Sequence, residues 1–374
     1  MLLSERGRAA VALASGLDLR PAARVSSAEA VRHLGPLGPL ALEQALLRAR
    51  SLAKHPDGDR LWWTAEALEQ STPRPVAVHR AARFAGSPRV LDVGCSVGGD
   101  LLPLANVAPV LGIDLDEARL LLARANADEL GLDVALVRAD ALTLAPTGDV
   151  FADPARRAGG RRTFDPRAFS PPLDVVLGWS TRSLAVKVAP GIDHEALPAE
   201  LEVEVVSLAG EVKEAVLWGG AVRTGHRRTA TVLPSGVTLV DSGAPVPDVR
   251  PPGRFLLEPD GAVIRAHLVA EVAQQVGGWL LDATIAYVAA DAVVPTGLGV
   301  WFEVLESLPF GLKPLRERLR AHDAGMVVVK KRGTAVEPDL LRKQLKLTGS
   351  REVTVVLTRS SGRQIAMVVR RTAP

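Results

Sequence analysis

The sequence predicts an α/β protein in which a helical segment precedes a parallel sheet and an α+β module follows it. Three observations support this fold class. Apolar residues recur at helical spacing through much of the segment 1–80. Around residue 90, a buried strand leads into a glycine-rich turn, as in nucleotide-binding α/β sheets. The C-terminal segment 311–374 combines short strands and helices and is rich in Lys and Arg.

The composition limits the class of protein. A chain of 374 residues is long enough for two or three domains, and 47% apolar with 4% aromatic content predicts a core of Val, Leu and Ala. Cys95 is the only cysteine, which excludes intrachain disulfides, and no Cys and His set has metal-binding spacing. No apolar run reaches the roughly 18 residues of a membrane span. Because charged residues also interrupt any signal-like start, we expect a cytoplasmic protein with no metal and no membrane partner.

The segment 1–84 is expected to be helical. Helical spacing covers residues 28–33 and 40–54, and further helices are expected at 65–70 and 76–84 around a Ser-Thr-Pro break. Trp62 and Trp63 are interpreted as packing anchors. The alternative is that they cover a cofactor or stack on a base.

Residues 90–100, VLDVGCSVGGD, predict a buried strand, a tight turn and the start of a helix. Glycines allow positive φ and leave no Cβ in the way, so backbone N–H groups can approach a ligand closely. Twenty-two residues after Asp92, Asp114 ends a second strand, where a carboxylate can accept hydrogen bonds from ribose hydroxyls. Together these features predict a nucleoside-containing cofactor.

The glycine spacing indicates which cofactor binds. The dinucleotide fingerprint reads G-x-G-x-x-G, but Ser96 occupies its second glycine position, which disfavours a dinucleotide oxidoreductase. The pattern D-V-G-C-S-V-G-G resembles the first motif of class I S-adenosylmethionine-dependent methyltransferases. The resemblance implies an S-adenosyl-L-methionine site formed by Asp92, Gly94, Cys95, Ser96, Gly98, Asp114 and Leu115. A turn with incidental glycines is the alternative, and Asp114 at the expected distance weakens it.

A third apolar strand, residues 132–137, is followed by Asp140 and Ala141. In the family that this chain resembles, an acid at this place hydrogen-bonds the adenine amino group, and the resemblance extends the cofactor site to Asp140 and Ala141. Asp is also a common helix N-cap, so a capping role for Asp140 is the alternative.

Asp153 and Pro154 end a fourth strand and resemble the D/N-P-P-Y/F/W signature of methyltransferases that modify base nitrogens. The resemblance implies that Asp153 and the Pro154 carbonyl accept hydrogen bonds from the amine, aiming its lone pair and stabilising its developing charge. Ala155 and Arg156 stand where the signature has Pro and an aromatic residue. Arg156 could stack on a base or bind phosphate. An ordinary Asp-Pro turn is the alternative.

The catalytic domain is expected to span residues 85–243. Later strands are expected at 174–176, 184–188 and 202–208, with 212–218 returning antiparallel to its predecessor. Lys187 lies in an apolar strand and either extends outward to solvent or lines the site. A hairpin is expected from strands 229–233 and 237–241, and a Pro-rich linker then marks a boundary.

The C-terminal part is expected to hold an α+β, ferredoxin-like connecting domain at residues 254–310, with a helix at 263–276, and a basic domain at 311–374. The latter has fifteen Lys and Arg against five Asp and Glu, the charge expected for nucleic-acid binding, although a solvated basic face is the alternative. Its expected order is helix, strand 325–331, helix 339–347 and strands 352–358 and 364–370. The segment resembles the THUMP-like domain that follows a group of bacterial methyltransferases; THUMP domains proper bind transfer RNA.

Together these resemblances imply a class I methyltransferase with a Rossmann-like sheet, an N-terminal helical segment and a THUMP-like module. The expected reaction is methylation of a base nitrogen in RNA, tRNA or rRNA. RNA would contact the basic C-terminal domain and the arginine-rich stretch from Arg156 to Arg167. A non-catalytic RNA-binding relative and a small-molecule methyltransferase are the alternatives. The sequence makes no prediction of oligomeric state.

Overall fold

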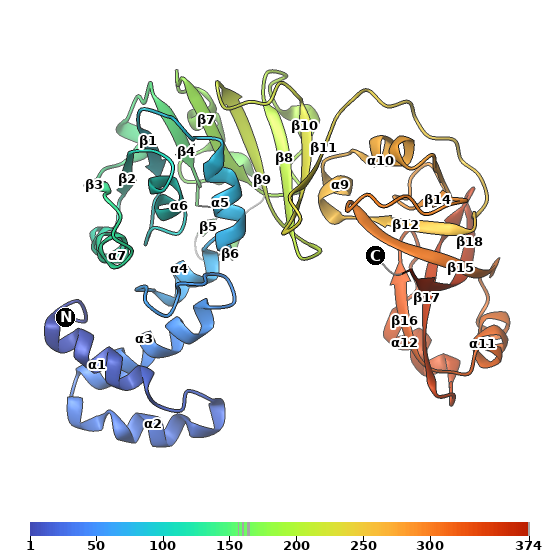
Figure 1. Ribbon diagram of the computed structural model, residues 1–374, viewed down its shortest axis with the longest axis horizontal. Helices are drawn as coiled ribbons and strands as arrows, with labels where there is room; N and C mark the ends of the chain where they lie inside the picture. The colour runs from blue at the N-terminus through green and yellow to red at the C-terminus, as the bar shows by residue number, and fades with distance from the viewer. Residues whose placement is uncertain (156, 159–160, 163–164, 373–374) are drawn as a thin grey trace. The chain divides into compact units, whose positions relative to one another are not determined.

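The computed structural model describes residues 1–155, 157–158, 161–162 and 165–372. The chain forms two compact units, the first from residues 1–192 and 215–224 and the second from residues 193–214 and 225–374 (Figure 1). The predicted division at 1–84, 85–243, 254–310 and 311–374 stays a prediction. Arg156 lies outside the described residues. None of the helices in the described part of the chain has the length and apolar content that a membrane span requires.

The N-terminal segment is helical, as predicted. Its helices are α1 (Glu5–Ser15), η1 (Pro21–Ala23), α2 (Arg24–Ala30), η2 (Arg32–Leu34), α3 (Leu37–Ser51), α4 (Ala65–Gln70) and α5 (Arg74–Ala82). The side chains of Ser4 and Thr64 accept N-cap hydrogen bonds at the starts of α1 and α4. Trp62 is buried against α1 and α3, and Trp63 is buried in the catalytic core, so both are packing anchors.

The sheet of the first unit is parallel except at one edge. Its strands are β1 (Val90–Val93), β2 (Val110–Asp114), β3 (Ala135–Arg138), β4 (Asp149–Ala152), β7 (Ser183–Val188) and residues 215–220 of β9 (Glu211–Gly220). They lie in the order β9-β7-β4-β1-β2-β3, with β9 antiparallel to β7. The register sets Val93 beside Ile113 and Ala152, so the loops after β1, β2 and β4 meet at one edge.

The connections of the first unit complete the α/β fold. They are α6 (Leu101–Ala105), α7 (Glu117–Glu129), η3 (Ala141–Thr143), β5 (Arg157–Ala158), β6 (Arg161–Arg162), η4 (Pro166–Ala168) and α8 (Leu173–Leu177). The predicted strand at 174–176 is wrong, because these residues form α8. Leu173 and Val176 are buried three positions apart, which is helical spacing, and Asp174 suits the positive end of a helix dipole.

The second unit begins with η5 (His194–Ala196) and β8 (Glu202–Leu208), which pairs in parallel with β10 (Arg228–Leu233). The hairpin of β10 with β11 (Val237–Val240) confirms the prediction. The single helix expected at 263–276 is instead two, α9 (Gly261–Arg265) and α10 (Val269–Gln275). The cause is His267, whose φ of 59° no right-handed helix allows.

A seven-stranded sheet forms the rest of the second unit, with α11 (Leu312–Ala321) and α12 (Pro338–Leu345) packed against it. Its order is β13 (Trp279–Leu280), β14 (Val288–Ala290), β12 (Phe255–Pro259), β15 (Gly299–Pro309), β18 (Arg363–Arg371), β17 (Arg351–Ser360) and β16 (Ala324–Lys331). Val355 and Leu357 pack with α11 and α12, whereas Val356 packs on the opposite face. The hydrogen-bonded sheet runs across the predicted boundary at residue 310, because β15 pairs with β18.

Candidate active site

The turn after β1 adopts the backbone conformation that its glycines predict. Gly94, Ser96 and Gly98 have φ of 80°, 51° and 98°, in the left-handed region that glycine enters without strain. The N–H groups of Gly94 and Cys95 donate to the Ile113 carbonyl at 2.9 and 3.0 Å, which ties the turn to β2. Ser96 has a Cβ, so its conformation costs roughly 1 kcal/mol and needs support from its surroundings.

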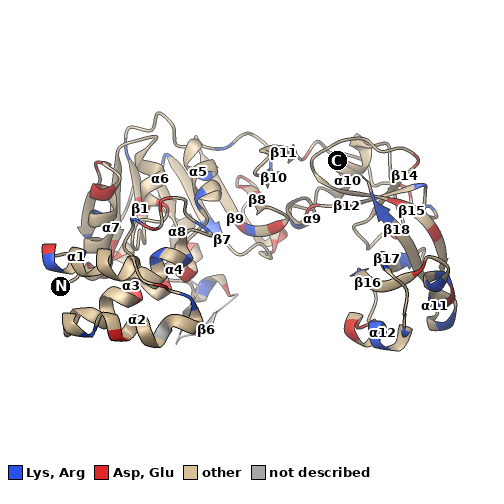
Figure 2. Ribbon diagram, turned by 60° about the horizontal axis from the view of Figure 1, so that its bottom comes forward, with Lys and Arg blue, Asp and Glu red and all other residues tan. Residues whose placement is uncertain are grey.

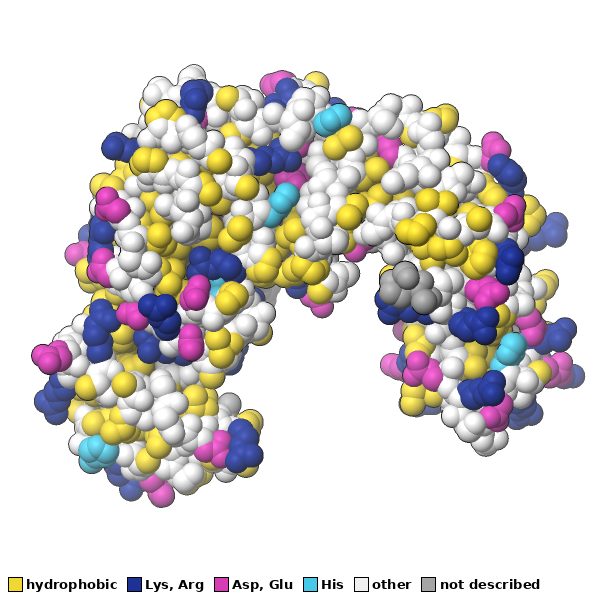
Figure 3. Space-filling view, viewed as in Figure 1, with side chains coloured by type: hydrophobic (Ala, Val, Ile, Leu, Met, Phe, Trp, Pro, Cys, Tyr) yellow, Lys and Arg dark blue, Asp and Glu magenta, His cyan; other side chains and the backbone are white. Residues whose placement is uncertain are grey.

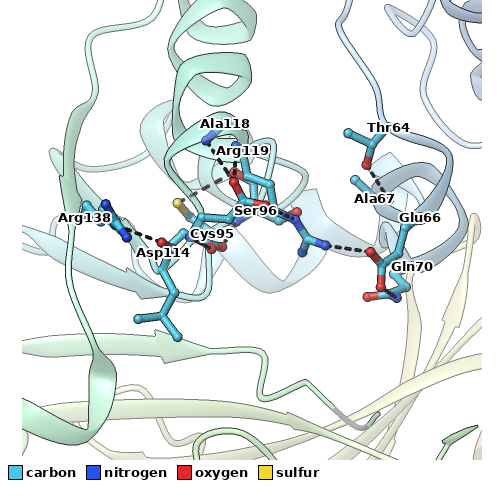
Figure 4. Close-up of polar contacts among 12 residues, drawn as sticks. Thr64, Glu66, Ala67, Gln70, Cys95, Ser96, Asp114, Ala118, Arg119 and Arg138 are labelled. Atoms are coloured by element: carbon cyan, nitrogen blue, oxygen red, sulfur yellow. Dashed lines mark hydrogen bonds and ion pairs between the residues drawn. The ribbon is translucent and has the colours of Figure 1, made fainter. Parts of the chain in front are cut away.

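Asp114 supplies that support. Its carboxylate accepts hydrogen bonds from the backbone N–H groups of Ser96 and Asp116, both at 2.9 Å (Figure 4). Arg138 of β3 donates to the Leu115 carbonyl at 3.1 Å and holds the same loop. Since an ionised carboxylate has about four lone-pair sites, Asp114 keeps acceptor capacity for hydroxyl groups of a ligand.

Asp140 follows β3 at the same edge of the sheet. The Ala139 N–H donates to the Asp114 carbonyl at 3.3 Å, and the Asp140 carboxylate accepts from the Leu142 N–H at 2.9 Å, capping η3. The capping role that the sequence left open is therefore present. Asp140 and Ala141 are half-buried beside the Asp114 loop, and contact of either residue with adenine stays a prediction.

Two further carboxylates, one buried and one half-buried, lie close to the turn. Asp92 on β1 is 1% exposed, and its Oδ2 has no hydrogen-bond partner among the described residues. Burial, with a further contribution from the Asp100 carboxylate, raises the pKa of Asp92 well above its usual value. Burial also opposes ionisation of Asp100, but the charges of Arg80 and Lys187 and a hydrogen bond from Thr72 together outweigh it, so the pKa of Asp100 is lowered. Asp92 thus offers a buried acceptor to a donor or cationic ligand.

Asp153 lies directly after β4, and its N–H donates to the Val93 carbonyl at 3.4 Å. Its side chain is 27% exposed, and Lys187 Nζ donates to its Oδ2 at 2.6 Å. Lys187 Nζ also donates to Thr72 Oγ1 at 2.8 Å. Lys187 therefore lines the site rather than extending to solvent, which resolves the alternative that the sequence left open. Pro154 is buried next to Asp153.

Cys95 takes no chemical part. It is 3% exposed, and burial raises the pKa of its thiol far above the usual value, so no thiolate is available as a nucleophile. Its Sγ packs against Gly112, where an added Cβ would come within 2.9 Å of the sulfur. Among the described residues, no group of three or more His, Cys, Asp and Glu could hold a metal ion.

Sequence reasoning missed three residues that the fold brings to this site. Thr72 precedes α5, Arg80 lies on α5 and Asp100 precedes α6. Arg80 stacks on the Phe151 ring at 4.4 Å and pairs with Asp100. The one usable signal was a lysine in an otherwise apolar strand, because a buried ammonium requires a partner.

Comparison with known proteins agrees with this geometry. The chain is 42% identical over 340 residues to an uncharacterized S-adenosylmethionine-dependent methyltransferase of Mycobacterium tuberculosis, covering 87% of this chain and 94% of the relative. A methyltransferase-domain family model matches residues 90–152, and a THUMP domain-like model matches residues 299–371. A suspected methyltransferase from Porphyromonas gingivalis W83 has a crystal structure with the same fold, at a TM-score of 0.76, 19% identity and full coverage of both chains.

Proposed function

Because this chain belongs to the S-adenosylmethionine-dependent methyltransferases, we propose that it transfers the methyl group to a base nitrogen in RNA. Methyl transfer from S-adenosyl-L-methionine follows from the family. The RNA base as acceptor is the proposal. The observation that carries it is Asp153, a carboxylate beside the cofactor turn with one oxygen held by Lys187 and the other without a partner among the described residues.

The residues of the turn fit the cofactor, which supplies a methyl group on an electrophilic sulfonium. Gly94 has no side chain on the side that faces Asp153. A Cβ added there would lie 3.5 Å from the Asp153 carbonyl oxygen. Asp114 would accept hydrogen bonds from the ribose, and the unpartnered Oδ2 of Asp92 would accept from the cationic part of the ligand. Backbone groups at Gly98 and Cys95, the Leu115 side chain and the Asp140–Ala141 loop complete the proposed site.

Asp153 would act on the acceptor. Its Oδ1 can accept a hydrogen bond from the amine, which directs the nitrogen lone pair, and the Pro154 carbonyl can serve as a second acceptor. As the nitrogen bonds to the methyl carbon, the carbon–sulfur bond would break and S-adenosylhomocysteine would leave. Nearby oxygen acceptors would stabilise the positive charge on the nitrogen until its proton is lost to solvent. No covalent enzyme intermediate is involved, because Cys95 is buried and protonated.

The second unit supports a polyanionic substrate. Arg316 of α11 donates to the carbonyls of Leu345 and Gln344 at 3.1 and 2.7 Å, so α11 and α12 lie side by side; we call them the helix pair. Lys and Arg lie along both helices (Figure 2). The exposed cations with no ion-pair partner among the described residues are Lys313, Arg320 and Lys343 of the helix pair and Lys346, which directly follows α12. Such cations can neutralise phosphates, and the THUMP-like match covers both helices.

Several other cations of this region are paired within the unit. Lys330 and Arg332 both contact Glu258, at 2.6 and 3.5 Å. Residues 254–310 carry seven Asp and Glu against two Lys and Arg, so the whole sheet is less basic than the segment 311–374 alone. Basic and acidic side chains accordingly alternate over its surface (Figure 3). The unpaired cations of the helix pair are therefore the proposed RNA contacts.

The test is transfer of radiolabelled methyl from S-adenosylmethionine to an extract of cells that lack this gene, fractionated into RNA, protein and small molecules. Asp153→Ala is the test variant, and Asp133→Ala, an exposed aspartate of the same unit, is the matched control. Label in RNA that is lost only with Asp153→Ala supports the proposal. Label in protein or small molecules, or no label from a protein that binds the cofactor, overturns it.

A further inference from the structure

Lys187 is a buried cation beside the reacting groups. Its side chain is 8% exposed and lies on β7 between Val186 and Val188. Removing an ammonium group from water costs several kcal/mol unless it is paired and hydrogen-bonded. Asp153 Oδ2 at 2.6 Å and Thr72 Oγ1 at 2.8 Å provide such partners. Asp153 and Thr72 therefore offset the cost of burying the Lys187 ammonium group at this place in the fold.

Thr72 comes from the N-terminal helical segment, in a loop whose position is fixed. Lys54 Nζ donates to the carbonyls of Leu68, Glu69 and Ser71 at 2.9, 2.8 and 3.1 Å. His55 Nε2 and Ser71 Oγ are hydrogen-bonded at 2.9 Å. Burial lowers the pKa of His55 to about 4, so this histidine is neutral at pH 7. Thr72 thus presents its hydroxyl from a rigid support.

The Thr72 hydroxyl links two charged groups. It accepts from Lys187 and hydrogen-bonds the Asp100 carboxylate. A threonine hydroxyl has one donor and two acceptor sites, so it can serve both neighbours at once. Asp100 is paired with Arg80 and precedes α6, two residues after Gly98. A continuous polar chain therefore runs from Asp153 through Lys187 and Thr72 to the end of the cofactor turn.

We infer that Lys187 is a positioning residue for methyl transfer, which occupies Oδ2 of Asp153 and leaves Oδ1 for the acceptor, and that Thr72 fixes Lys187. The inference rests on the proposed function for the role of Asp153. It makes the N-terminal helical segment part of the active site, because that segment supplies Thr72. A carboxylate that could rotate freely would spend part of its time turned away from the acceptor, which would slow the chemical step.

Kinetics separate positioning from a structural role. The acceptor is unmodified RNA from the fraction that takes up label in the extract assay. With it, Lys187→Met should lower kcat by roughly 10²-fold, while the Kd for S-adenosylmethionine stays within about threefold of the wild-type value. Lys187→Arg should recover part of kcat. The double variant with Asp153→Asn should be no slower than Asp153→Asn alone, because the two residues act as a unit. Lys213→Met, which removes the Lys213–Glu211 pair at 2.5 Å, is the matched control.

Thr72 is tested in the same assay. Thr72→Val should lower kcat by roughly tenfold, and Thr72→Ser, which keeps the hydroxyl, should stay near the wild-type value. The inference would be overturned if these variants lost only thermal stability or cofactor affinity. It would also be overturned if the rate losses of Lys187→Met and Asp153→Asn multiplied in the double variant.

A binding measurement keeps the inference testable without turnover. Sinefungin carries an amine where S-adenosylmethionine carries its methyl group, and S-adenosylhomocysteine carries nothing there. In Lys187→Met the charge of Asp153 is uncompensated, so sinefungin should gain about tenfold in affinity relative to S-adenosylhomocysteine by calorimetry. An unchanged ratio contradicts the inference. If the affinity ratio changes but RNA takes up no label in the extract assay, RNA is rejected as the acceptor, and the role of Lys187 in holding Asp153 is kept.

Discussion

The active site and the helix pair hold charges of opposite sign in opposite environments. Around the cofactor turn the fold gathers four aspartates, Asp92, Asp100, Asp114 and Asp153, with Arg80 and Lys187 as cations. These groups are buried or half-buried, and all but Asp92 have defined partners. The helix pair instead exposes cations with no ion-pair partner among the described residues. An excess of buried carboxylate suits a sulfonium ligand, and exposed cations suit phosphates.

The difference also concerns how each region obtains its binding energy. Each hydrogen bond to a buried carboxylate matters individually. If one is lost, the free-energy cost of removing that group from water is no longer compensated. Exposed cations act together, each contributes little, and salt screens them. Single substitutions should therefore have large effects at the site, whereas several are needed on the helix pair.

The largest effect is expected for Asp114→Ala. This change removes the acceptor of the Ser96 and Asp116 N–H groups as well as the ribose partner, and should weaken S-adenosylmethionine binding by roughly 10²-fold. Calorimetry measures the affinity. Asp116→Ala, which removes the cap of α7 and an ion pair with Arg119, should change it little. An Asp114→Ala affinity within about threefold of wild type would remove this residue from the cofactor site.

A smaller effect is expected on the helix pair. Lys313→Ala, Lys343→Ala and Lys346→Ala combined should weaken RNA binding by about tenfold and lower the slope of log K against log salt by about 2 to 3 units. Cofactor affinity should not change. Binding titrations across salt concentrations measure both quantities.

A matched control is the triple variant Arg32→Ala, Arg50→Ala and Arg89→Ala, which removes exposed cations of the first unit. Equal losses of RNA affinity in the two triple variants would mean that RNA binding depends only on the total charge of the protein. In that case the helix pair would have no special part in binding, and the comparison between the two regions would fail.

The smallest effect is expected for Asp92→Asn, and it concerns the free energy of unfolding. Because the folded pKa of Asp92 is raised, its neutral form favours folding at low pH, and this contribution is lost as pH rises above 3.8. Asn should therefore stabilise the free protein by about 1 kcal/mol at pH 7 and by little near pH 4. Thermal unfolding at both values tests this. Destabilisation at pH 7 would show that the Asp92 carboxylate is ionised and paired without ligand.

Local parts of the site were predictable from sequence, and long-range parts were not. The glycine turn and Asp114 follow from short-range rules of backbone conformation and strand ends. Thr72 and Lys187 are separated by 115 positions, and only the packing of the N-terminal segment brings them together. No local pattern marks Thr72. Helix α8 was missed because apolar residues alone do not distinguish short helices from strands, and the break at His267 was missed because no local pattern predicts its positive φ.

The charge of the C-terminal part shows a related limit. A count over residues 311–374 predicts a strongly basic domain, yet β12 and β15 bring Glu258 and Glu303 into the same sheet. Glu303 pairs with Arg370 at 2.5 Å, and Glu258 pairs with Lys330. Sequence counts cannot tell which cations such neighbours neutralise. Point substitutions on the helix pair are therefore sharper tests than removal of the segment, which would also strip β18 from β15.

The division of β9 between the two units has a consequence for biosynthesis. Residues 193–214 belong to the second unit, although the first unit resumes at residue 215 and gains its edge strand only when residues 215–220 pair with β7. On the ribosome, the first unit cannot complete its sheet before residue 220 has emerged. By then β8 and its neighbour β9 are outside, whereas β10, the parallel partner of β8, has yet to emerge. A growing chain must therefore hold β8 with only one of its two neighbouring strands while it finishes the first unit.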